Sequence, residues 1–268
     1  MIDTQMTGQP DVVAALLTGL GSGNVEVFDL TAPLSSKTPA LRLPPQFPNI
    51  MDLELENIAQ FDQRGPMWAH NNIHVGEHYG THVDAPAHWI TGRDGRDVSQ
   101  LPMQKLVGEG VVIDVNERVQ ENPNFLLEIE DVKAWEAEHG ALPDGGWVLL
   151  RTGWDKHDYE ESVFLGCDED GVSNTPGVSA ECAKWLAEET PIAGIGVETV
   201  GIDAGRGFDF EPPLPVHYYF LGNDKYGVTS LKNLAKLPTR GALLIVLPLP
   251  LVGGTASPAR VIALVTQD

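Results

Sequence analysis

The chain is organised around one stretch, which reads His78-Tyr79-Gly80-Thr81-His82-Val83-Asp84-Ala85-Pro86-Ala87-His88. It holds three of the chain's eight histidines and an aspartate in a single short run. Alternate side chains of an extended segment share a face, so His82, Asp84 and His88 can point toward one place. Gly80 permits a backbone bend that would bring His78 to the same place. The pattern predicts a metal site.

The expected protein ligands are two imidazoles and one carboxylate, from His78, His82 and Asp84. This set suits zinc, manganese or iron(II) and leaves coordination positions open for water and substrate. A catalytic site therefore fits the pattern better than a closed structural one. A lone histidine is more often a hydrogen-bonded core residue than a ligand, and we expect that role for His70 and His74 just upstream.

The stretch resembles the His-x-Gly-Thr-His-x-Asp-x-Pro-x-His signature of the metal-dependent cyclase family, which includes bacterial kynurenine formamidases and isatin hydrolases. The resemblance continues through residues 72–77, His217 and residues 254–260, and it covers most of the chain from about Asn24 onward. Of the two activities, isatin hydrolysis looks closer. The resemblance implies a twisted mixed β-sheet that closes toward a barrel, with helices outside, and a homodimer or larger assembly.

The length and composition set wider limits. We expect residues 1–268 to form one α/β domain with an N-terminal helical extension over residues 1–23. The sequence has no apolar run of about eighteen residues and no signal-like N-terminus, so we expect neither a membrane span nor export. Cys167 and Cys182 are too few for a disulfide framework, so a cytoplasmic protein is expected.

The charge and the motifs exclude several classes of protein. A formal net charge of −21, from 17 basic and 38 acidic residues, argues against a nucleic-acid partner. The sequence contains neither a Gly-x-Ser-x-Gly nucleophile elbow nor a glycine-rich phosphate loop, so serine hydrolases and nucleotide-binding proteins lack support. Gly194-Ile195-Gly196 is at best a fragment of a dinucleotide motif, and we interpret it as a strand-end turn.

Hydrophobic periodicity predicts more strands than helices. Strands are expected at residues 25–30, 71–76, 111–115, 147–152, 192–197, 242–247 and 261–265. Helices are expected at residues 12–20, 129–139 and 179–189, the last with Ser179 as its N-cap. Because helices lie between only some of the strands, a mixed sheet with flanking helices is favoured over a regular βαβ repeat.

His88 is the candidate general acid and base. It lies four residues beyond Asp84 and past a proline, so it can reach the pocket without being a ligand, and an imidazole titrates near working pH. The resemblance implies the same role. The alternative that His88 is a third histidine ligand stays open at this point.

His217 and Ser230 are the other candidate catalytic residues. In the family's kynurenine formamidases, a histidine at the position of His217 and an acid about a dozen residues later hold a second metal. That later position falls here at Thr229 and Ser230, so we expect one metal, with His217 free to hydrogen-bond or relay protons. Ser230 resembles a serine on a proton-conducting water path in isatin hydrolases, and it could equally cap a helix at residues 231–234.

Phe47, in the Pro-rich connection of residues 33–48, and Trp68 are the aromatic residues expected to line the pocket. The resemblance implies hydrolysis of a cyclic amide, isatin, to isatinate, with manganese as the metal and zinc compatible with the ligands. An arylformamidase acting on N-formylkynurenine is the alternative from the same class. A non-enzymatic metal- or small-acid-binding protein is the alternative from another class, but a pure binder has no need of a proton carrier such as His88.

Overall fold

The computed structural model describes residues 11–43, 46–157 and 160–267, so residues 1–10 of the expected N-terminal extension and residues 44–45 of the Pro-rich connection lie outside it. Within these ranges the main sheet has eight strands in the order β1-β12-β11-β5-β7-β9-β10-β4. Its strands are β1 (Val25–Asp29), β4 (His82–Asp84), β5 (Val107–Asp114), β7 (Trp147–Arg151), β9 (Gly194–Val197), β10 (Tyr226–Val228), β11 (Ala242–Pro248) and β12 (Ala256–Thr266). Because β4 also pairs with β12, the sheet closes. The expected mixed sheet closing toward a barrel is confirmed.

The long strand β12 closes the barrel because one of its edges serves two partners. Its first residues pair antiparallel with β4, with Ala256 opposite Asp84, and its last residues pair with β1, with Val25 opposite Thr266. On its other side β4 runs antiparallel to β10. Strand β4, inside the histidine-rich stretch, is therefore the strand at which the barrel closes, and we call it the barrel seam. It lies between the parallel strands β5, β7, β9 and β10 and the antiparallel strands β11 and β12.

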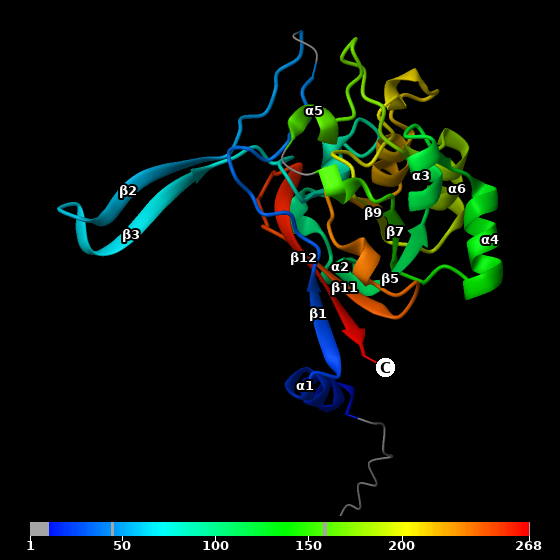
Figure 1. Ribbon diagram of the computed structural model, residues 1–268, viewed down its shortest axis with the longest axis horizontal. Coiled ribbons are helices and arrows are strands. Elements are labelled where there is room, and N and C mark those ends of the chain that lie inside the picture. Colours follow the sequence, from blue (N-terminus) through cyan, green and yellow to red (C-terminus); the bar gives the residue numbers. More distant parts are fainter. Residues whose placement is uncertain (1–10, 44–45, 158–159, 268) are drawn as a thin grey trace, which may run out of the picture.

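Two hydrophobic layers follow from side-chain alternation along the strands. In β7, Trp147 and Leu149 join the cluster shared by strands all around the barrel, whereas Val148 and Leu150 join the cluster beneath the helices. The covering helices are α4 (Ile129–His139) and α6 (Ala180–Glu189), which lie along one side of the molecule (Figure 1). Burying one such Leu is worth about 1.5–3 kcal/mol, so both layers hold the strands in register.

The long helices begin and end close to where the sequence predicts. Helix α4 has the predicted bounds and ends at Gly140, and the side chain of Ser179 caps α6 by accepting from the Cys182 N–H. The N-terminal helix is α1 (Val12–Ser22), which ends at a left-handed Gly23. None of the described helices combines the length and the apolarity needed to cross a bilayer.

The remaining elements are short. They are η1 (Pro86–His88), η2 (Val98–Gln100), α2 (Met103–Leu106), α3 (Asn116–Glu121), β6 (Leu126–Leu127), η3 (Trp154–His157), α5 (Glu161–Phe164), β8 (Gly177–Val178), η4 (Gly207–Asp209), the π-helix η5 (His217–Leu221) and η6 (Leu234–Lys236). The interpretation of Gly194-Ile195-Gly196 as a turn is wrong, because these residues lie inside β9. A Cβ on Gly194 would stand 2.5 Å from the Tyr226 carbonyl oxygen, so close strand packing requires this glycine.

The strands β2 (Glu54–Asp62) and β3 (Gly65–His74) form a separate antiparallel hairpin that projects from the body (Figure 1). The sequence predicted only the end of β3, at residues 71–76. The expectation of core histidines here is wrong, since His70 and His74 are exposed and His74 Nε2 lies 3.0 Å from Glu56 Oε2. Large apolar side chains on the hairpin, including Met67 and Ile73, are also exposed.

Candidate metal centre

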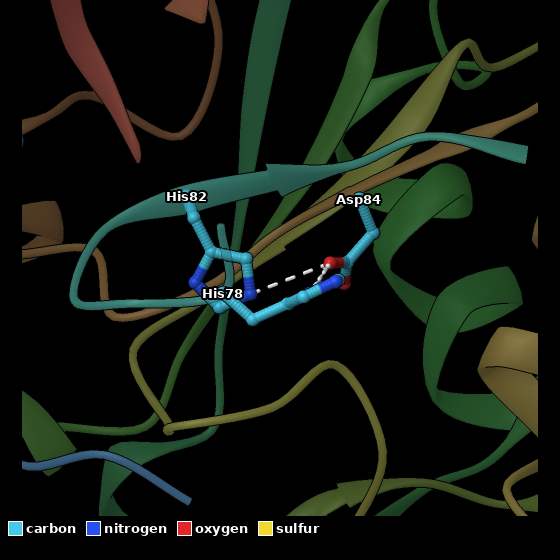
Figure 2. A group of neighbouring side chains, drawn as sticks. All are labelled: His78, His82 and Asp84. Carbon is cyan, nitrogen blue, oxygen red and sulfur yellow. Dashed lines mark hydrogen bonds and ion pairs between the residues drawn. The ribbon is translucent and has the colours of Figure 1, made fainter. Parts of the chain in front are cut away.

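His78, His82 and Asp84 point toward one another at the barrel seam (Figure 2). Each offers a ligand atom, and these atoms all lie within 4.8 Å of one another. His78 Nδ1 is 2.9 Å from Asp84 Oδ1, and His82 Nε2 is 3.3 Å from the same oxygen. The geometry brings together the three residues that the sequence selected as metal ligands.

The local backbone explains this convergence. In β4 the side chain of Val83 enters the barrel core, so His82 and Asp84 share the opposite face. Gly80 has a φ of 63°, in the left-handed region, and a Cβ there would stand 2.2 Å from Leu34. Only glycine adopts this bend without strain, and the bend returns the chain so that His78 faces the strand.

The donor set fits a divalent cation. Two ligands on adjacent coordination positions, at bonds of about 2.1 Å, lie about 3 Å apart, which is close to the two separations from Asp84 Oδ1. His82 Nδ1 is 2.8 Å from the Gly80 carbonyl oxygen, which can only accept, so this nitrogen carries the hydrogen. The lone pair of His82 Nε2 then faces Asp84, and a cation between the two resolves the repulsion.

Asp84 is buried and anionic. Burial alone would raise the pKa of its carboxyl group, but the contacts with His82 and His78 outweigh this and hold the pKa well below its usual value. A buried carboxylate next to two imidazoles is a suitable ligand for a divalent ion.

His88 lies against the triad, but it reaches this place differently from the prediction. The strand alternation stops at Pro86, where the chain turns into η1, and this turn carries the His88 ring to 4.0 Å from the His78 ring, centroid to centroid. Burial, the main cause, lowers the pKa of His88 to about 3. The imidazole is therefore neutral at neutral pH, which is the form that accepts a proton.

His217 joins the same cluster and has a partner that the sequence did not indicate. Its ring lies 5.4 Å from the His88 ring, and its Nδ1 lies 2.5 Å from Asp203 Oδ2. Burial alone would lower the pKa of His217, but the hydrogen bond and charge of Asp203 outweigh it and raise the pKa. Asp203 also accepts from the Val216 and His217 N–H groups, so it fixes the start of the π-helix.

The aromatic wall beside the histidines is Trp89. Its ring lies 4.9 Å from the His217 ring and 5.8 Å from the His88 ring, and among the described residues its Nε1 is buried without a hydrogen-bond partner. Phe47 and Trp68 are 54% and 45% exposed, and Trp68 lies on the projecting hairpin. Their assignment to the substrate pocket stays a prediction.

Thr229 and Ser230 contact the segment that leads from His78 to His82. Thr229 Oγ1 is 3.0 Å from His82 Nδ1, and the Ser230 carbonyl accepts from the Thr81 hydroxyl at 2.7 Å. The helix-cap interpretation of Ser230 is wrong, because the following 3₁₀ turn, η6, has Asn233 as its N-cap. Ser230 instead lines a cavity together with Gly80, and its proton-path role stays a prediction.

Comparisons with known proteins agree with this geometry. Residues 28–204 match the family described as "Putative cyclase". The isatin hydrolase of Roseibium aggregatum is 44% identical over 258 residues, which span 94% of this chain and 97% of that protein. A kynurenine formamidase of Salinibacter ruber is 27% identical over 71% of this chain and 77% of that protein. An isatin hydrolase structure with the product analogue thioisatinate superposes with a TM-score of 0.93, at 41% identity, and the match covers 97% of this chain and 100% of that one.

Proposed function

The chain belongs to the cyclase family, and from this premise we propose that it is a metal-dependent hydrolase that opens the cyclic amide isatin to isatinate. The convergence of His78, His82 and Asp84 beside the neutral His88 carries the proposal, because it supplies both a cation site and a proton acceptor. The near full-length likeness to isatin hydrolases supports the choice of substrate.

The proposed ligands are His78 Nδ1, His82 Nε2 and Asp84 Oδ1, which would hold one divalent ion per chain. Such an ion supplies Lewis acidity toward the amide carbonyl and lowers the pKa of water from about 15.7 toward about 7–9. We propose manganese, which the carboxylate favours among harder ions, and zinc also fits the ligands. A second ion has no support, since Thr229 and Ser230 offer no carboxylate.

His88 would carry the proton. The water oxygen bonds to the lactam carbonyl carbon while His88 accepts a proton from the water, and His88 then gives a proton to the ring nitrogen as the C–N bond breaks. His217, held through Nδ1 by Asp203, turns its Nε2 toward Asp84 at 3.8 Å and is placed to hydrogen-bond the reacting group or relay protons. Ser230 would continue the proton path on the far side of the segment that leads from His78 to His82.

The pocket favours a flat, neutral substrate. Trp89 offers an aromatic face next to His88 and His217. N-Formylkynurenine carries a tail with two charges, and the net charge of −21 disfavours its carboxylate. Isatin also has a ketone beside the scissile amide, which activates the carbonyl and can share the ion.

We expect kcat/KM for isatin to exceed that for N-formylkynurenine by at least ~10-fold, a difference of about 1.4 kcal/mol in transition-state binding. Absorbance assays of both substrates on one manganese-loaded preparation measure the ratio. Equal or reversed values would assign the chain to the formamidases, and saturable binding of both without turnover would favour a non-enzymatic binding protein.

We further propose a homodimer of single-domain chains, in the cytoplasm. The β2–β3 hairpin supports the dimer, because a two-stranded hairpin is marginally stable alone and this one exposes Leu55, Met67 and Ile73. If Phe47 and Trp68 line a substrate pocket, this pocket would be that of the second copy, because Trp68 lies on the hairpin that projects from its own chain. Sedimentation velocity tests the dimer, and a monomer at micromolar concentration would contradict it.

A further inference from the structure

The ring of His78 has two nitrogens, and only one of them faces Asp84. We propose that Thr255 and Glu77 form a hydrogen-bonded relay that keeps the proton of His78 on Nε2 and so leaves Nδ1 free to bind the ion. The inference rests on the proposed metal site. It assigns a positioning role to two residues that are not ligands.

The hydrogen bonds determine the direction of the relay. Glu77 Oε2 accepts from the Thr255 N–H at 2.9 Å and from the Thr255 hydroxyl at 2.7 Å. An ionised carboxylate only accepts, so the single hydroxyl hydrogen of Thr255 points to Glu77. Thr255 Oγ1 also lies 3.1 Å from His78 Nε2, where it can now only accept. The hydrogen of that contact must therefore come from His78.

The barrel seam holds the relay in place. Thr255 immediately precedes β12, its carbonyl accepts from the Ala85 N–H at 3.0 Å, and Ala256 pairs with Asp84. The hydroxyl is thus fixed relative to the strand that carries the ligands. Glu77 directly precedes His78, and barrel closure brings Thr255 to both of them, although Thr255 lies 178 residues from Glu77 in sequence.

The relay suppresses a competing state of the site. If His78 carried its hydrogen on Nδ1, it would donate to Asp84 Oδ1, which lies only 2.9 Å away. His78 Nδ1 and Asp84 Oδ1 would then be hydrogen-bonded to each other, and an ion would have to break this hydrogen bond before it could bind. With the hydrogen on Nε2, the two atoms present lone pairs to the same point and the site is prepared for a cation.

Zinc affinity of the full-length protein, measured by competition with a chromophoric chelator, tests the relay. Thr255→Val removes the hydroxyl at nearly constant volume and is expected to weaken binding ~10–100-fold, the range found when partners of metal-bound histidines are removed. Thr255→Ser keeps the hydroxyl and should restore affinity to within about 3-fold. Thr31→Val is the matched control, because its hydroxyl binds the backbone of Val261 on β12 and not a ligand.

Glu77→Ala breaks the relay at its other end. It frees the Thr255 hydroxyl to donate to His78 Nε2, so affinity should fall by a similar factor although the hydroxyl remains. Nitrogen-15 spectra of histidine-labelled, zinc-loaded wild type should show His78 protonated at Nε2 and metal-bound at Nδ1. This signature reports the tautomer directly and does not depend on how well a variant folds.

Unchanged affinity in Thr255→Val, or a spectrum with zinc on His78 Nε2, would overturn the relay while leaving the metal site intact. A wild type that binds no zinc or manganese would overturn the proposed function itself, and the relay with it. Loss in Thr255→Val, rescue in Thr255→Ser and an unaffected Thr31→Val would together support it.

Discussion

Replacing His82 or Asp84 with alanine is expected to remove the metal ion and to abolish isatin hydrolysis. Each change deletes one of the three proposed protein ligands, and the two that remain would leave the ion mostly to solvent. Asp84→Ala also removes the buried anion that balances the cation, so its effect should be at least as large. Elemental analysis after gel filtration gives the metal content, and the absorbance assay gives the rate.

His139→Ala is the matched control for His82→Ala. His139 lies at the end of α4, outside the cluster of His78, His82, His88 and His217, and should keep full metal content and activity. Asp84→Asn keeps the size of the side chain but removes its charge, which separates loss of the anion from loss of packing. Stoichiometric metal at unchanged affinity in His82→Ala or Asp84→Ala would refute the ligand assignment.

The second large effect concerns His88. His88→Ala should retain the ion and lose about 10²–10⁴-fold in kcat, the usual contribution of a general acid and base. The reason is geometric, because the His88 ring lies tilted against the His78 ring and the proposed ligand atoms come from other residues. Metal content and single-substrate kinetics on the same preparation measure the two quantities together.

His88→Gln serves as a second variant, since an amide of similar reach can hydrogen-bond but cannot accept a proton at neutral pH. It should be as slow as His88→Ala if proton transfer is the role. Loss of metal in both variants would make His88 a ligand, the alternative that the sequence left open. Wild-type rates with full metal would show that His88 is not the proton carrier of the reaction.

The sequence selected the three side chains that converge in the structure, because they lie within one short run. His82 and Asp84 share a strand face, and Gly80 supplies the bend for His78, so local rules are sufficient. The same rules did not predict β4 as a strand, since three residues are too few for a periodic signal. Its role as the barrel seam depends on β12, which lies far away in sequence.

Partners distant in sequence were missed for the same reason. Asp203 follows the buried strand β9 and binds His217, while Glu77 and Thr255 meet only when the barrel closes. A carboxylate in the loop after a buried strand is a usable signal for Asp203. Trp89 directly follows His88, but most buried tryptophans are core residues, so the sequence alone did not favour it.

Stepwise addition of manganese to metal-stripped protein, with isatin hydrolysis followed by absorbance, tests whether hydrolysis depends on one metal ion per chain. We expect negligible activity without metal, a linear rise on addition, and a plateau at one ion per chain. Full activity in the stripped protein, or a plateau that needs two ions per chain, would contradict it.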